Sequence, residues 1–518
     1  MIEKLRDRLD RLPYSPSVIA FFFGALTFLL RFPFLFRYDL FFGSDPGICY
    51  LMPLRILKGD RPFYFYSETH QGSTESYLTA LLFKVFGPSI PLAAGQSLFL
   101  WAIAVALGVY LLTRSTSKFH GVAAGLVAAI SVPYTLIYVT VPYIGYPGSF
   151  MITMLVLVQA YVILEKGPTG WRFFWFSWVV GTGLFVGKQC LPAVGACLLA
   201  MALVHTPACD FRRLLKPLFA LGAATGLLLG YWPEILYRLT HPGYRDFSKL
   251  ADPWGMFCNL KECRKALFAY FDAHPFSRIP TDIYFYRSIP YWGVHCAGPV
   301  DLLFAGLGLA VLYFSYKILR RSLVEKNAGL FLLTSLLFLN ILAVVISRES
   351  VQNIFNVRRY LHTSAISISL LTGYLFTFLL LKLEKKYFQW ALFGLAALFL
   401  LRSAWHQYAF LGRPDGLREI RWLIRDMKAN GLYRGISNYG PNYSANALSE
   451  ESVIIGNFDG DLIPEYADLV SQADKVAVIG YKGEPIEDKI NFHGHDYQRI
   501  GDPHINEILR WTPYRKIS

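Results

Sequence analysis

Two acidic residues within residues 37–88 are the side chains best suited to catalysis. Asp45 follows the first hydrophobic run by a few residues, and Glu75 lies in the polar turn HQGSTES. The surroundings of an acid beside the end of a membrane span are neither water nor lipid. Such surroundings can raise its pKa toward the value that a general base needs. Both acids also have structural alternatives. Asp45 could cap a helix that begins near Gly47, and Glu75 could be a first-turn acid of the following helix.

Cysteine and histidine residues raise the question of a metal site. The candidate ligands in residues 237–298 are Cys258 and Cys263 in CNLKEC, His274, His295 and Cys296. We expect the CNLKEC pair to form a disulfide in an oxidising compartment, because its spacing to a histidine is loose for zinc. The group His493, His495 and Asp496 is more typical of a surface turn. The sequence requires no cofactor, and a divalent metal ion stays an alternative.

The composition indicates a chain that spans a membrane many times. Of its 518 residues, 54% are hydrophobic and only 17% are charged, against about 25% charged in soluble globular proteins. This balance excludes a soluble enzyme and a disordered scaffold. The net charge of +14 does not indicate DNA binding, because Lys and Arg concentrate in the short cytoplasmic loops of membrane proteins.

The fold class predicted is an all-α polytopic membrane protein with about 11 transmembrane helices and a small C-terminal α/β domain. Each proposed span is near the roughly 20 residues that cross a bilayer. The spans are 16–36, 89–113, 120–138, 148–165, 171–187, 189–205, 214–236, 299–318, 328–346, 361–382 and 387–402. Residues 77–87 are too short to cross, and we expect a helix that lies at the membrane surface or re-enters it. The first span is expected to be retained as an anchor.

The distribution of basic residues predicts a cytoplasmic N-terminus. Basic residues populate the turns that would then be cytoplasmic, and Lys188 is the only one in the two short opposing turns. Three longer segments are then extracytoplasmic. They are a first loop (37–88), a long loop (237–298) and a C-terminal domain (403–518) that follows a transmembrane domain (1–402).

Hydrophobic periodicity indicates an α/β fold for the C-terminal segment. Asp415 can cap a helix that Gly431 ends, with Leu417, Ile420, Ile424 and Met427 on one face. The apolar runs 452–456 and 475–481 are typical of buried strands. We therefore expect a small α/β domain on the outer membrane face.

An ordered set of segments resembles a known family. The set comprises Asp45 followed by Tyr50, LRILKGDRPFYF, HQGSTESYLTALLFKVFGPS and VRRYLHTSAISISLL. It is similar to GT-C membrane glycosyltransferases, in particular bacterial proteins like dolichyl-phosphate-mannose protein mannosyltransferases and lipid A aminoarabinose transferases. The C-terminal stretch from Leu423 to Tyr466 resembles some bacterial members loosely.

The resemblance implies transfer of a sugar, with inversion, from a polyprenyl-phosphate donor to an acceptor at the outer membrane face. A carboxylate should take the proton of the attacking hydroxyl, and the family's first-loop acid falls on Asp45. Members often have a pair of adjacent acids there, whereas Pro46 follows here. Members also often have an acid in the second external loop, but residues 141–150 contain none. Glu75 or the acceptor could supply the second carboxylate.

Three basic residues are implied to hold the donor phosphate, whose charge grows as the sugar leaves. Lys188, in GLFVGKQC, resembles a lysine that contacts the lipid phosphate in this family. GLFVGKQC also resembles a nucleotide-binding P-loop. It is one residue shorter than that motif and lacks its Ser or Thr, so we do not expect nucleotide binding. Arg358 and Arg359 match the family's Arg-Tyr at the start of a span. The alternatives are a snorkelling lysine at a span end and an arginine anchor at the interface.

Competing functions are a transporter or flippase of lipid-linked sugars, and a membrane protein that binds envelope glycans. A transporter should place polar or charged residues in the middle of several spans. Here the central parts of most spans are apolar, which favours a transferase of the cytoplasmic membrane. Its expected partners are a polyprenyl-phosphate-linked sugar, a glycolipid, polysaccharide or protein acceptor, and the bilayer, with no nucleic acid.

Overall fold

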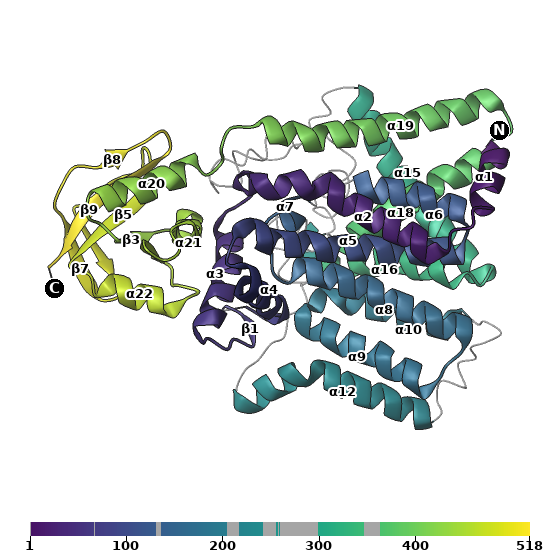
Figure 1. The fold of residues 1–518 in the computed structure, drawn as a ribbon, viewed down its shortest axis with the longest axis horizontal. Coiled ribbons are helices and arrows are strands. Elements are labelled where there is room, and N and C mark those ends of the chain that lie inside the picture. Colours follow the sequence, from purple (N-terminus) through teal and green to yellow (C-terminus); the bar gives the residue numbers. More distant parts are fainter. Residues whose placement is uncertain are drawn as a thin grey trace.

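The computed structural model describes residues 2–66, 68–130, 136–204, 217–241, 255–256, 258–259, 299–346 and 363–517. Long helices lie side by side in one body, and a mixed α/β domain lies at one end of it (Figure 1). The end of the helical body next to this domain also carries α3, α4 and a short β-hairpin.

The helical body confirms the prediction of a mostly helical membrane protein. Its elements are α1 Ile2–Asp10, α2 Pro16–Arg31, η1 Phe32–Leu40, α5 Ile90–Ser115, α6 Lys118–Ile130, α7 Leu136–Val139, α8 Tyr146–Lys166, α9 Gly170–Val186, η3 Lys188–Cys190, α10 Leu191–Leu203, α12 Pro217–Thr240, α15 Pro299–Val324, α16 Ala328–Ile346, α18 Thr363–Lys382 and α19 Lys386–Ala409. Each predicted span contains one of these helices. Seven described helices are long and apolar enough to cross a membrane, so the count of 11 stays a prediction.

The first loop folds into two helices and a hairpin. These are α3 Ser44–Lys58, β1 Tyr64–Phe65, β2 Glu68–Gly72 and α4 Thr74–Phe86. The predicted helix at 77–87 is therefore present and begins at Thr74. Its polar residues Ser76 and Thr79 are buried, whereas Leu81 and Val85 are exposed. The placement of this helix at the membrane surface stays a prediction.

The C-terminal segment folds into a mixed β-sheet with helices, as the predicted small α/β domain requires. Its elements are η6 Phe410–Gly412, α20 Arg418–Ala429, β3 Arg434–Ser437, α21 Tyr439–Leu448, β4 Ile454–Asn457, α22 Pro464–Ser471, β5 Lys475–Tyr481, β6 Lys489–Phe492, β7 His495–Arg499, β8 His504–Ile505 and β9 Leu509–Lys516. The strand order is β4-β3-β5-β9-β7-β6, with β8 paired to β9. The two predicted strands correspond to β4 and β5.

The predicted apolar face of α20 is confirmed. Leu417, Ile420, Ile424 and Met427 are all buried. The helix ends where Gly431 takes a positive φ of 69°, a left-handed conformation that favours glycine. Helix α20 therefore covers the sheet with the side chains that its 3.6-residue period selects.

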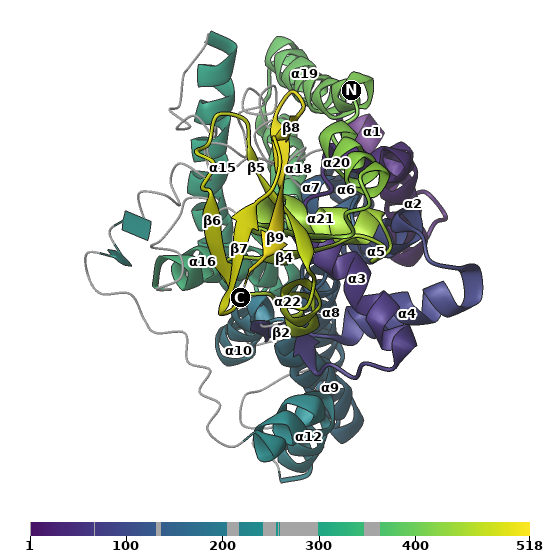
Figure 2. The same cartoon turned by 90° about the vertical axis from the view of Figure 1, so that its left-hand side faces the viewer.

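A shared hydrophobic core joins the C-terminal domain to the first loop. Ile48, Leu51 and Met52 of α3 belong to the same buried cluster as Ile436 and Tyr443. Helix α21 of the domain packs against α3 (Figures 1 and 2). Their backbones approach closely at Gly47, where an added Cβ would lie 2.6 Å from the carbonyl oxygen of Tyr443. The domain is thus packed onto the first loop rather than only tethered to the last span.

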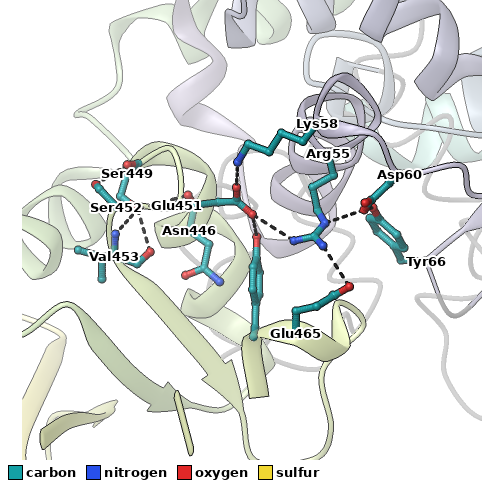
Figure 3. Close-up of polar contacts among 11 residues, drawn as sticks. Arg55, Lys58, Asp60, Tyr66, Asn446, Ser449, Glu451, Ser452, Val453 and Glu465 are labelled. Atoms are coloured by element: carbon teal, nitrogen blue, oxygen red, sulfur yellow. Dashed lines mark hydrogen bonds and ion pairs between the residues drawn. The ribbon is translucent and has the colours of Figure 1, made fainter. Parts of the chain in front are cut away.

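Ion pairs reinforce this contact at the other end of α3. Figure 3 shows Arg55 among three carboxylates, with distances of 2.9 Å to Asp60, 3.5 Å to Glu451 and 3.2 Å to Glu465. Glu451 also pairs with Lys58. Burial alone would raise the pKa of Glu451, but its contacts with Lys58, Tyr466 and Arg55 lower it overall. The interface therefore holds Glu451 as a carboxylate.

We expect Arg55→Met to weaken docking of the C-terminal domain. The side chains of Arg55 and Glu451 are 15% and 11% exposed, and losing hydrogen bonds between charged groups costs about 2 kcal/mol. Amide hydrogen exchange of α21 should accelerate. Arg418→Met is the matched control, because Arg418 and Glu507 are 66% and 63% exposed and such pairs contribute about 1 kcal/mol or less. Equal exchange rates in the two variants would contradict this account of the interface.

Candidate active site

Asp45 lies in the first turn of α3, where three parts of the chain meet. The helix begins at Ser44 after Gly43, so the alternative in which Asp45 caps a helix starting near Gly47 is wrong. An acid in the first turn is favourable because the helix dipole is positive there. The Asp45 carboxylate accepts hydrogen bonds from the hydroxyl of Tyr143 at 3.0 Å and from that of Tyr439 at 2.6 Å.

Tyr143 lies in the second loop (residues 139–147), between α7 and α8. Its ring packs against those of Tyr138 and Tyr146, with centroids 5.0 and 5.4 Å away. The hydroxyl of Ser97 on α5 lies within hydrogen-bond distance of its backbone N–H and carbonyl, at 3.3 and 3.4 Å. These contacts hold the Tyr143 hydroxyl against Asp45.

Glu75 is the buried acid of the first loop. Its side chain is only 4% exposed, and Oε1 accepts the backbone N–H groups of Gly145 at 2.9 Å and Gly148 at 3.1 Å. Burial raises the pKa of Glu75 to about 8, and the two backbone hydrogen bonds oppose that rise. Glu75 is a first-turn acid of α4, as the structural alternative predicts. Its carboxyl group, however, accepts hydrogen bonds from the start of α8.

The glycine at position 148 makes room for this contact. A Cβ there would lie 2.3 Å from Oε1 of Glu75. Glu75 thus brings a carboxyl group to the second loop, which has no acid of its own between 141 and 150. Both hydrogen bonds come from backbone N–H groups, so Glu75 stabilises the conformation of the second loop. Its role as a second catalytic acid stays a prediction.

Lys188 lies in η3, between α9 and α10, and is partly exposed. The preceding residue, Gly187, packs so closely on the first turn of α8 that an added Cβ would lie 2.3 Å from Oγ of Ser149. Among the described residues, the neighbouring Gln189 has a buried side-chain amide with no hydrogen-bond partner. Buried polar groups normally have partners, so this amide is suited to receiving a ligand beside Lys188.

The contacts place the first loop, the second loop and the C-terminal domain at one end of the helical body. The second loop touches the first through Asp45 and Glu75, and the C-terminal domain touches Asp45 through Tyr439. The Lys188 turn lies against the same end of α8. The structure thus brings Asp45, Glu75 and Lys188 to the same end of the helical body, as the distribution of basic residues predicts. That this end is extracytoplasmic stays a prediction.

Arg358 and Arg359 lie outside the described residues, as do Cys263, His274, His295 and Cys296. The predicted phosphate contacts of the arginines and the CNLKEC disulfide therefore stay predictions. Within the described part of the chain, no group of three or more His, Cys, Asp or Glu side chains is placed to hold a metal ion.

Sequence patterns missed the two tyrosines and a buried acid in α12. Glu234 is 0% exposed and accepts hydrogen bonds from Tyr64 of β1 and from Nε of Arg238, the latter at 2.7 Å. This cluster ties the β1–β2 hairpin to the end of α12. No local pattern singles out these side chains, so only their meeting in three dimensions identifies them.

No family model matches the chain, and no curated protein matches it either. Among solved structures, ArnT from Cupriavidus metallidurans bound to undecaprenyl phosphate aligns over 95% of this chain and 97% of its own, with a TM-score of 0.56 and 8% identity. The chain has a GT-C-like fold. The apo oligosaccharyltransferase of Archaeoglobus fulgidus aligns over 91% of this chain and 70% of its own, with a TM-score of 0.48 and 15% identity. The predicted GT-C resemblance is thus confirmed at the level of the fold.

The raised pKa of Glu75 predicts a pH-dependent stability. The folded chain holds this proton up to about pH 8, whereas an unfolded glutamic acid loses it near 4.5. The folded state therefore binds more protons between these values, and its stability should fall as the pH rises through them. Glu75→Gln keeps an acceptor for Gly145 and Gly148 but cannot ionise.

We expect the thermal midpoint of Glu75→Gln to vary less between pH 5 and pH 8 than that of the wild type. Glu419→Gln in the C-terminal domain is the control for a general effect of removing a carboxylate. A wild type and a Glu75→Gln variant with parallel midpoint curves would contradict the assignment.

Proposed function

We propose that the chain is an inverting glycosyltransferase that moves a monosaccharide from a polyprenyl-phosphate-sugar donor to an acceptor at the outer face of the cytoplasmic membrane. The observation that carries the proposal is the position of Asp45, which three separate segments hold at one end of a GT-C-like helical body. The structural neighbour ArnT, which shares this fold, was determined with undecaprenyl phosphate bound.

The chemistry assigns a role to each side chain. An acceptor hydroxyl attacks the anomeric carbon, forming a new C–O bond while the bond to the phosphate oxygen breaks with inversion. Asp45 takes the proton of the attacking hydroxyl and later releases it to water. An ionised carboxylate is an acceptor of hydrogen bonds only, so it can take this proton.

The leaving polyprenyl phosphate gains negative charge, which nearby cations stabilise. Lys188 is the candidate among the described residues, with the Gln189 amide as a neutral donor beside it. Arg358 and Arg359 are proposed as further phosphate contacts from the family resemblance alone. The isoprenoid tail would lie along the apolar helices, because lipid is the solvent that these surfaces suit.

Comparison of envelope glycans tests this function. Mass spectrometry of envelope glycolipids and polysaccharides would compare cells that carry wild type, no protein or Asp45→Asn at matched expression. We expect one sugar-bearing product to disappear without the protein, and to fall about 100-fold or more in Asp45→Asn because the general base is lost. Asp468→Asn, which changes an exposed carboxylate of the C-terminal domain, should keep the product.

The outcomes separate the function from the site. A product that is lost without the protein but made by Asp45→Asn would contradict the assignment of Asp45 and leave the transferase. Identical profiles in all four strains would contradict the transferase and favour a transporter or a glycan-binding protein.

A further inference from the structure

The first turn of α21 lies against the first turn of α3. The hydroxyl of Ser44 lies within hydrogen-bond distance of the carbonyl oxygens of Tyr439 and Gly440, the latter at 2.6 Å. The phenol of Tyr439 reaches the next residue, Asp45, at 2.6 Å. Two consecutive residues of the first loop are thus held by two consecutive residues of the C-terminal domain.

This arrangement depends on the docking of the whole domain. Gly47, one half-turn after Asp45, is where the two backbones touch, and Ser44 also lies 3.3 Å from Oδ1 of Asn442. The phenol of Tyr439 comes from the first residue of α21, so its direction follows from the position of that helix. Displacing α21 would remove the donor from Asp45.

We propose that the C-terminal domain completes the active site and that Tyr439 is a positioning residue for Asp45. This inference rests on the proposed function. Tyr143 donates to Oδ2 of Asp45 from the helical body, and Tyr439 donates to Oδ1 from the C-terminal domain. These two donors reach different oxygens, so together they fix the plane of the carboxylate relative to the acceptor hydroxyl.

The proposal separates Tyr439 from the residues that only dock the domain. The Arg55 network lies at the opposite end of α3 from Asp45, and it stabilises the domain without touching the carboxylate. Loss of Arg55 should reduce the amount of correctly docked protein. Loss of the Tyr439 hydroxyl should change the behaviour of Asp45 itself.

The test uses purified full-length protein in nanodiscs, supplied with a membrane extract of cells that lack the protein as the source of donor and acceptor. Mass spectrometry follows the initial rate of product formation. The variants are Tyr439→Phe, Arg55→Met, Asp45→Asn and the control Tyr433→Phe, which alters a half-exposed tyrosine of the same domain. Tyr439→Phe and Arg55→Met are each also combined with Asp45→Asn.

We expect Tyr439→Phe to lower the rate about tenfold in the wild-type background and to have no further effect in the Asp45→Asn background, because it acts through that carboxylate. Arg55→Met should lower the rate by the same factor in both backgrounds, and Tyr433→Phe should match the wild type.

A Tyr439→Phe variant with the wild-type rate would overturn the inference. So would a loss of the same size in the Asp45→Asn background, as for Arg55→Met, since it would mean that Tyr439 only docks the domain. Failure of the proposed function itself is recognised differently. In that case the wild type makes no more product than the extract without added protein, and the positioning role falls with it.

Discussion

The position of the second loop depends on the carboxyl group of Glu75, which is buried in the first loop. Its Oε1 takes two backbone N–H groups at the start of α8, groups that would otherwise be buried at a helix end without partners. By fixing Gly145 and Gly148, this contact also fixes Tyr143 two residues earlier. Tyr143 in turn contacts Asp45, so the candidate base depends on a buried acid elsewhere in its own loop.

The C-terminal domain adds the second support of the site. Apolar residues of α3 enter the core of the domain, and the Arg55 ion pairs hold the far end of α3 (Figure 3). At the junction with α19, Arg37 donates to the carbonyl oxygen of Arg413 at 2.7 Å and pairs with Asp39 at 3.0 Å. The domain is therefore held at Arg37 and at the far end of α3, and Asp45 lies between these attachments.

Local patterns predicted the helices, α20 and β5, because hydrophobic periodicity records which face of each element is buried. They also identified Asp45, whose position after a span is a local feature. Tyr439 could not be found in this way, since it contacts Asp45 across 394 residues. Glu75 was a candidate from the sequence, but its partners could not be predicted, because they lie 70 and 73 residues away. Such contacts depend on which helices pack together, and a hydropathy pattern does not specify this.

The most direct test of this account is an experimental structure of the full chain with undecaprenyl phosphate bound. The account predicts that the phosphate lies within hydrogen-bond distance of Nζ of Lys188, at the end of the helical body that carries Asp45 and the C-terminal domain. A phosphate bound at the opposite ends of the helices, away from both Lys188 and Asp45, would contradict it.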